Sequence, residues 1–258
     1  MENQSEEPAE LGNILLRIGA SLLHSGAGST RVTKNLKRIA EAYGYDAHPD
    51  LGTRTISLTL DRKNRDEHAF TGSRSISSLP GVDFTIISGI SKLSWDVVEK
   101  PVTLDELRSE FDKVMKSIHY PRNVVLALVG LAGISLCYTF GGTWIEMGAT
   151  FVATLSGLFV RQEMLRMKYN PYLVTFCGAA WATLVVSMAS ALLPVINFEH
   201  AFATSILFLI PGVPLIMSFI DLMDGYIINA IDRGVHASIH AFAIALGLTL
   251  VLYLFNLA

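Results

Sequence analysis

The chain has 258 residues, of which 51% are hydrophobic and 17% are charged, and its mean hydropathy is +0.42. Roughly a quarter of the residues are charged in ordinary soluble domains, so this composition excludes that class, and it also excludes disorder and a disulfide scaffold. A net charge of −3 excludes a nucleic-acid binder that depends on bulk positive charge. Of the 43 charged side chains, 33 lie in residues 1–122, so a polar segment precedes a membrane segment.

The polar segment, residues 1–120, has the pattern of a small α+β domain. Met1–Glu10 is acidic and lacks the basic and apolar parts of a signal peptide, so we expect this domain to remain in the cytoplasm. Ser29 or Thr30 is the expected cap of its second helix. In chain order, the predicted elements are helices Leu11–His24 and 29–43, strands Thr53–Asp61 and Ala69–Ser77, and helices Val82–Glu99 and Leu104–Ile118, the last with a Thr103–Glu106 capping box.

Five apolar stretches follow Pro121, and each is long enough to cross a hydrocarbon core about 30 Å thick. Breakers at Gly141-Gly142, Asn170-Pro171 and Pro194 separate them. Residues 121–258 are therefore predicted to form a five-helix transmembrane domain, and the fold class is an α-helical integral membrane protein with an N-terminal cytoplasmic α+β domain. The predicted spans are Val124–Phe140, Thr143–Val160, Tyr172–Leu193, Ala201–Ile220 and Ala237–Leu257.

The basic residues near these spans predict the orientation of the chain. They precede span one, lie between spans two and three, and lie between spans four and five, whereas the connections 141–142 and 194–200 contain none. Under the positive-inside rule the N-terminal domain is cytoplasmic and the C-terminal Ala258 lies outside, in agreement with an odd number of spans. The expected location is the cell (inner) membrane.

The segment Gly26–Ser29 lies between two predicted helices, and glycines before a helix N-terminus suit a bound phosphate. A nucleotide-binding loop follows a strand, and a P-loop carries a lysine, but neither feature is present here. A plain helix–turn–helix corner is therefore the favoured interpretation. His24 beside Ser25 or Ser29 is compatible with a hydrolase, but the chain has no nucleophile elbow and no placeable acid, so we do not favour an enzyme.

The segment Pro211-Gly212-Val213-Pro214 interrupts the fourth apolar stretch. Prolines remove backbone donors and leave carbonyls unpaired, which lipid cannot satisfy, so such a break indicates protein packing or a wet cavity. Broken membrane helices present half-helix N-termini to anionic groups such as carboxylates. A simple packing kink is the alternative.

Several ionisable side chains flank the spans, and each has two interpretations. Asp221, in the connection after span four with Asp224, Asp232 and Arg233, is predicted either to take protons and pair with Arg233 or to be a solvated loop acid. For the others the membrane interface or snorkelling is favoured over a buried role; they are Glu146, Glu199, Arg161, His236 and His240. Cys137 and Cys177 are expected to be free thiols, and no metal site is expected.

The motif Leu23–Val32 resembles the N-terminal motif of the threonine/serine exporter family, with Gly26 and Arg31 as its motif residues. The resemblance covers about residues 11–250 and departs at Thr33, where family members often carry an acid. It continues through Thr53–Leu60, Arg161-Gln162, Pro211-Gly212-Val213-Pro214-Leu215, Asp221-Leu222, Gly225 and Arg233.

The family includes longer one-chain amino-acid exporters and two-component exporters, one of them for succinate, in which a larger subunit works with a small membrane subunit. The resemblance implies that this chain is such a larger subunit and exports a small carboxylate-bearing metabolite, threonine or serine or a dicarboxylate such as succinate. The proton gradient is the simplest source of energy, and we expect no cofactor, metal or nucleic acid. The predicted substrate-binding residues are Pro211, Gly212, Pro214, Arg161, Gln162 and Arg233, and the proton-coupling candidates are Asp221 and Glu146.

Other arrangements stay open at this stage. The carrier acts in the lipid bilayer either with the small membrane subunit or as a homo-oligomer. A membrane-anchored enzyme or sensor that acts through its cytoplasmic domain is the alternative from another class, and a regulatory subunit of a separate pore is a third.

Overall fold

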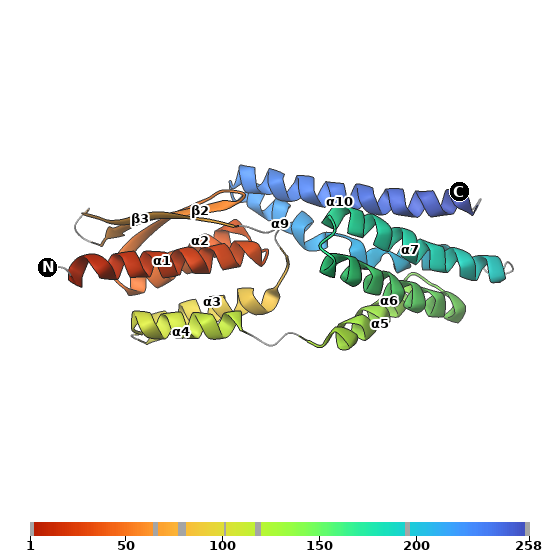
Figure 1. Cartoon of the computed structure of the whole chain (residues 1–258), viewed down its shortest axis with the longest axis horizontal. Coiled ribbons are helices and arrows are strands. Elements are labelled where there is room, and N and C mark those ends of the chain that lie inside the picture. Colours follow the sequence, from red (N-terminus) through yellow and green to blue (C-terminus); the bar gives the residue numbers. More distant parts are fainter. Residues whose placement is uncertain are drawn as a thin grey trace. The chain divides into compact units, whose positions relative to one another are not determined.

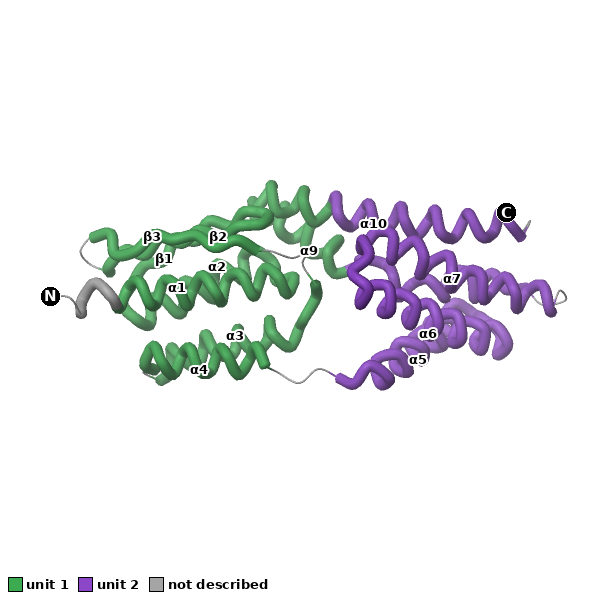
Figure 2. The backbone as a smooth tube through the Cα atoms, in the orientation of Figure 1, with its two compact units in different colours: residues 1–118, 213–234 green, residues 119–212, 235–258 purple. Residues whose placement is uncertain are grey.

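The structure is a computed structural model of the chain, and it describes residues 3–63, 67–76, 81–100, 102–116, 120–193 and 197–255, with side chains from residue 7 onward. Contacts divide the chain into two compact units (Figure 2). Unit 1 consists of residues 1–118 and 213–234, and unit 2 consists of residues 119–212 and 235–258. The domain boundary predicted at residue 120 stays a prediction, and unit 1 also takes in a segment from the second half of the chain.

Unit 1 is an α+β unit with a three-stranded antiparallel sheet in the order β1-β2-β3 (Figure 1). Four of its helices and two of its strands confirm elements that the sequence predicts. Its elements are α1 (Asn3–His24), α2 (Ser29–Ala42), β1 (Tyr45–Leu51), β2 (Thr55–Arg62), β3 (Glu67–Ser75), α3 (Phe84–Glu99), α4 (Leu104–Met115), nearly all of α9 (Gly212–Met223) and the first part of α10 (Ile227–Leu254).

One strand escaped the sequence analysis. β1 alternates apolar and polar residues, but it contains Pro49 and the acids Asp46 and Asp50, which are residue types depleted in strands, so the sequence analysis passed over it. It pairs only with β2 and therefore lies at an edge of the sheet, where the missing N–H of a proline is tolerated.

The core of unit 1 lies between α1 and the sheet. Ile56, Leu58 and Leu60 alternate along β2 and are fully buried, as the strand pattern predicts. The backbone of α1 approaches the sheet so closely that a Cβ on Gly12 would overlap the ring of Phe70. The predicted Thr103–Glu106 capping box is present at the start of α4, since each residue's side chain accepts the backbone N–H of the other.

Unit 2 is helical. The first three predicted spans are each one helix, and the fourth is broken. Its elements are α5 (Arg122–Thr139), α6 (Trp144–Arg166), α7 (Pro171–Leu192), α8 (Glu199–Ser205), the 3-10 turn η1 (Leu207–Leu209) and the rest of α10. The predicted ends at Ser77, Ile118, Leu257 and Ala258, and the breaker Pro194, lie outside the described residues.

Among the described residues, three helices are long and apolar enough to cross a membrane, namely α5, α7 and α10. Two shorter pieces, Glu199–Leu209 and Gly212–Met223, pass this test together as one broken span. The second predicted span is helical within α6, but α6 carries charged residues near both ends and is not among these candidates. The structure therefore supports a membrane protein with three or four candidate spans, and a count of five stays a prediction.

Helix α10 differs from the sequence analysis at its start. It begins at Ile227, ten residues before the predicted Ala237, so Asp232 and Arg233 lie on a helix and not in a connecting loop. Asp232 and Arg233 lower the hydropathy of this segment, so the apolar stretch is recognised only after them, although the two residues occupy less than one helical turn.

Candidate functional site

The corner between α1 and α2 is a helix–turn–helix corner, as favoured from the sequence. α1 ends at His24, and Gly26 has a φ of 79°, a left-handed conformation that glycine adopts without strain. The predicted side-chain cap on α2 is wrong, because Gly28 occupies the cap position and no side chain of that residue is available. Instead, the backbone N–H of Ser29 donates to Oδ1 of Asp221 at 2.9 Å.

Asp221 therefore acts as a cap for α2 from far along the chain. A carboxylate at a helix N-terminus is favourable, because the unpaired N–H groups and the helix dipole are positive there. Since the N–H of Ser29 is bonded to Asp221, this donor is not available to a phosphate, and the phosphate interpretation of Gly26–Ser29 stays the weaker of the two.

Asp221 is fully buried and forms an ion pair with Arg233, with Nε 3.1 Å from Oδ2. Oδ2 of Asp221 accepts no hydrogen bond, so the positive charge of Arg233 compensates the negative charge of this oxygen. Arg233 also donates to the carbonyl oxygens of Gly26 at 3.4 Å and Ala27 at 2.6 Å. The solvated-acid interpretation of Asp221 is thus wrong, and its pairing with Arg233 is confirmed.

Four more hydrogen bonds hold the segment 213–234 on the rest of unit 1, three of them to α2 and one to β1. The side-chain amide of Asn229 donates to Ser29 Oγ at 3.2 Å and to the carbonyl of Leu51 at 3.0 Å. Thr30 donates to Asp224 at 2.5 Å. Thr33, where family members often carry an acid, pairs its hydroxyl with that of Tyr226 at 3.0 Å. The segment 213–234 is therefore held on the α1–α2 corner by polar contacts.

The two serines considered for a hydrolase do not face a substrate. Ser29 is fully buried and bonded to Asn229, and Ser25 is 2% exposed. Neither serine is therefore exposed as a nucleophile would be, and both belong to the packed corner between α1 and α2.

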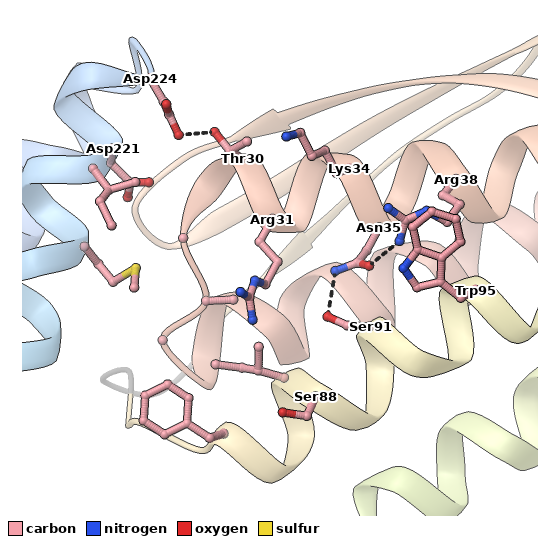
Figure 3. A pocket seen from close by; sticks show the side chains of 17 residues that line it. Thr30, Arg31, Lys34, Asn35, Arg38, Ser88, Ser91, Trp95, Asp221 and Asp224 are labelled. Atoms are coloured by element: carbon pink, nitrogen blue, oxygen red, sulfur yellow. Dashed lines mark hydrogen bonds between the residues drawn. The ribbon is translucent and has the colours of Figure 1, made fainter.

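A cavity of about 660 Å³ lies beside this corner, within unit 1 (Figure 3). Cationic side chains of α2, hydroxyls of α3 and the acids of α9 and its C-terminal turn line it, together with apolar groups. Arg31, a predicted motif residue, and Asp221, a predicted coupling residue, are both on its wall. The polar residues that line it are Thr30, Arg31, Lys34, Asn35, Arg38, Ser88, Ser91, Asp221 and Asp224.

Unit 2 holds a second polar group, made by α6, α7 and α10. Arg161 interacts electrostatically with His240, whose Nδ1 lies 2.9 Å from the hydroxyl of Thr175. One helical turn earlier, His236 is hydrogen-bonded to the hydroxyl of Tyr172. The two histidines share a helix face, as the i, i+4 spacing predicts, and the rings of both lie against Tyr172 of α7; their position at a membrane interface stays a prediction.

Glu146 is buried, 2% exposed, which corrects the expectation that it lies at the interface. Its Oε2 accepts from the N–H and hydroxyl of Thr143 at 2.8 and 3.1 Å, which makes a capping box at the start of α6. Its Oε1 faces the N–H and Nδ1 of His200, each at 3.1 Å. This environment favours the ionised carboxylate.

Gln162 does not point to an open site, because its Oε1 accepts from Nε of Arg122 at 2.7 Å. Arg122 also pairs with Glu163 at 3.0 Å and lies over the ring of Phe159, yet its Nη2 is buried without a partner. The sequence analysis used Arg122 only as an orientation signal. Its position between Pro121 and an apolar stretch was the available hint that it lies against the spans.

The predicted break in the fourth span is present. Ile210 has an extended backbone between η1 and α9, and α9 starts at Gly212 with Pro214 in its first turn. The carbonyl of Ser205, at the end of α8, accepts from the hydroxyl of Thr154 at 3.4 Å. The predicted substrate residues are thus divided, with Pro211, Gly212, Arg161 and Gln162 in unit 2 and Pro214 and Arg233 in unit 1.

These features can be compared with known proteins. The chain matches the threonine/serine exporter family, ThrE, over residues 13–255. It belongs to the threonine/serine exporter family. The resemblance drawn from the α1–α2 motif and the Pro-Gly-x-Pro break is thereby confirmed, and the family indicates a membrane transporter and not an enzyme.

Two relatives align with nearly the whole chain, and a third aligns with 86% of it. The chain is 24% identical over 260 residues to "Probable succinate transporter subunit YjjP" of Klebsiella aerogenes and 25% identical over 257 residues to the protein of that name in Escherichia coli, with 98% of each relative covered. It is 27% identical over 227 residues to "Probable threonine/serine exporter" of Mycobacterium tuberculosis, of which it covers 42%. No solved structure matches the chain.

Proposed function

We propose that this chain is the larger subunit of an exporter that carries a small carboxylate-bearing metabolite out of the cell, and that it works with a small membrane partner subunit. The observation that carries this proposal is its alignment with relatives named as transporter subunits, which spans nearly the full length of both proteins. Alignment with only 42% of the mycobacterial exporter agrees with a carrier whose second part is a separate chain.

Arg161 is the proposed carboxylate-binding residue. It is a half-buried cation within α6, and its Cβ lies against Gly178 of α7, since a Cβ added at Gly178 would lie 3.7 Å from it. The hydroxyl of Thr175 and the imidazole of His240 supply further hydrogen-bonding groups. A binding site for a small ligand typically consists of a small number of polar groups within an otherwise apolar helix bundle.

The break at Ile210–Gly212 supports transport more than anchoring. A helix that only anchors a domain gains nothing from a break, whereas carriers place broken helices where substrate and ions bind.

For proton coupling we propose Asp221 over Glu146. Both oxygens of Glu146 already face hydrogen-bond donors, whereas Oδ2 of Asp221 has only the ion pair with Arg233, which protonation would release.

The test is efflux of labelled succinate, serine and threonine from preloaded cells that express this chain with and without the small membrane protein encoded beside it. Efflux of one solute only when both are present is the expected result, and it would name the substrate. Efflux with this chain alone would indicate a homo-oligomer. If neither combination exports any solute although the chain is inserted, a regulatory or enzymatic role replaces the proposal.

The same assay tests the binding residue. Arg161→Gln should lower efflux about tenfold or more, because a charge-assisted hydrogen bond to a carboxylate contributes about 1.5–3 kcal/mol. Arg166→Gln is the matched control, since Arg166 lies on the same helix with an exposed side chain paired to Glu163. Equal efflux by the two variants would remove Arg161 from the site.

A further inference from the structure

We propose that the cavity of unit 1 binds a soluble organic phosphate, such as a nucleotide, between α2 and α3. The proposed ligand is not the transported carboxylate. Asp221, the proposed proton-coupling residue, lies on the wall of this cavity, but nucleotide binding is measured without transport, so the two proposals can fail separately. All residues that line the cavity belong to unit 1.

The charge on the cavity wall favours an anion. Arg31, Lys34 and Arg38 recur at spacings of three and four residues, which places them along one side of α2. The two acids on the wall are already engaged, Asp221 by Arg233 and Ser29 and Asp224 by Thr30. Figure 3 shows Arg31 pointing from α2 towards the side of the cavity where Ser88 lies.

Arg31 and Lys34 are the cations that remain available. Arg38 donates to Ser94 at 2.7 Å, and its Cζ lies 3.7 Å from the centre of the Trp95 ring. These contacts already engage its guanidinium, so it is a less available partner for a ligand. Within the described parts of the chain, neither Arg31 nor Lys34 has an ion pair or hydrogen bond.

The wall carries three cations of α2 against one acid, Asp224, that has no cationic partner among the described residues. Arg233 balances Asp221, whereas the hydroxyl of Thr30 does not neutralise Asp224. The remaining excess of positive charge is what a multivalent anion would neutralise.

The donor set suits phosphate better than carboxylate. A phosphate ester carries close to two negative charges and three acceptor oxygens. Arg31 and Lys34 of α2 and the hydroxyls of Ser88 and Ser91 of α3 line the cavity and give it donors from two helices. Figure 3 shows Lys34 on the side of Thr30 and Arg31 on the side of Ser88. A monocarboxylate has one charge and two oxygens, and it would leave part of this donor set unused.

The size of the cavity calls for an organic ligand. A volume of about 660 Å³ lies within the range of small-molecule sites and exceeds what inorganic phosphate fills. Phe84, Ile87 and Trp95 supply apolar surface on one wall, and Met217 and Ile220 of α9 supply it on the other. A ligand bound here would contact both α2 and α9, so its binding would stabilise the contact between these helices.

The experiment is calorimetric titration of the purified full chain in nanodiscs of phosphatidylcholine, with ATP, AMP, adenosine, inorganic phosphate and succinate as probes. We expect saturable binding of ATP or AMP and much weaker binding of the other three. Arg31→Ala and Lys34→Ala should each raise the Kd about tenfold, because each removes a charged partner of the phosphate.

Lys37→Ala is the matched control. Lys37 is an exposed cation on the same helix that is not part of the cavity wall, so its replacement should leave the Kd within about twofold. Arg31 and Lys34 are exposed on the surface of α2, so both variants should fold, which unchanged thermal unfolding would establish.

Three results would overturn the proposal. One is the absence of saturable binding by ATP and AMP in folded protein, and a second is an equal Kd for the Arg31, Lys34 and Lys37 variants. The third is loss of nucleotide binding when phosphatidylglycerol is added to the nanodiscs, which would assign the cations to a lipid headgroup.

Discussion

A buried carboxylate such as Asp221 is stable only when its charge is compensated, because moving an ion out of water costs several kcal/mol. Here Arg233 supplies the opposite charge and Ser29 supplies a hydrogen bond. Arg233 in turn has the carbonyls of Gly26 and Ala27. The pair thus serves the corner between α1 and α2 and makes that corner depend on residues far away in the sequence.

Removing one member of this pair should destabilise the chain strongly. Asp221→Asn and Arg233→Gln are each expected to lower the free energy of unfolding by about 3–5 kcal/mol, because each leaves an uncompensated buried charge. The double variant should lose less than the sum, since no unpaired charge remains. Denaturant unfolding of the detergent-solubilised chain, followed by circular dichroism, measures this.

Asp224→Asn is the control for that series, because Asp224 is exposed and bonded to Thr30. Its effect should stay below about 1 kcal/mol. If Asp221→Asn unfolds at the same denaturant concentration as the unchanged chain, the ion pair is not what stabilises the corner.

At the scale of elements, caps and close backbone contacts decide where helices begin and how near they pack. The start of α4 depends on Thr103 and Glu106, whose side chains satisfy N–H groups that the helix itself leaves unpaired. In unit 2, glycines on facing helices allow the backbones to approach, as Gly247 of α10 does against α7.

The capping box predicts a pH dependence of stability. Hydrogen bonds from the backbone and side chain of Thr103 hold the pKa of Glu106 below its ordinary value. A depressed pKa means that the folded state favours the carboxylate, so this stabilisation is present above the unfolded-state pKa and is lost as the pH falls through the folded-state pKa. Thermal unfolding of the full chain at pH 7 and at acidic pH measures it.

Glu106→Gln should reduce that pH dependence, since the replacement does not titrate. Glu110→Gln on the same helix is the matched control, because Glu110 pairs with Lys113 on the surface and caps nothing. The same loss of stability on acidification in the Glu106→Gln variant as in the unchanged chain would show that the cap does not contribute.

The packing of α10 on α7 predicts a steric effect. A Cβ on Gly247 would lie 2.7 Å from the carbonyl oxygen of Phe176 and 3.0 Å from Cβ of Ala179. The first atom is backbone and the second is a side chain of one carbon, so neither can move aside without a shift of the helix. Gly247→Val should therefore destabilise the chain by about 1–3 kcal/mol. The thermal midpoint of the detergent-solubilised protein measures this.

Gly148→Val is the control, because nothing lies within 4 Å of a Cβ at Gly148. Both variants carry the same helix propensity cost, so the difference between them isolates packing. Equal midpoints would mean that α7 and α10 do not pack as closely as described.

For the whole molecule, membrane insertion depends on the basic residues and on the apolar helices together. The helices α5, α7 and α10 satisfy the length and composition of a span, and the α8–α9 pair does so as one broken span. The proposed topology puts residue 63 in the cytoplasm and residue 199 outside, from the distribution of Lys and Arg.

This orientation is testable with single cysteines in a variant that lacks Cys137 and Cys177. Lys63→Cys and Glu199→Cys both replace exposed residues. In intact cells a membrane-impermeant maleimide should label residue 199 and should reach residue 63 only after permeabilisation. The reverse pattern would invert the topology and would make the carrier's proposed cytoplasmic domain an external one.

The sequence by itself determined most of the helices, two of the three described strands, the capping box and the break at Pro211, because periodicity, caps and prolines act over a few residues, but it missed the first ten residues of α10. It also determined the family, since the motif residues are spread along the chain in a fixed order. What only the tertiary structure decided is which polar groups meet. Asp221 and Ser29 are 192 positions apart, and whether an acid is solvated or buried depends on packing that no local pattern encodes.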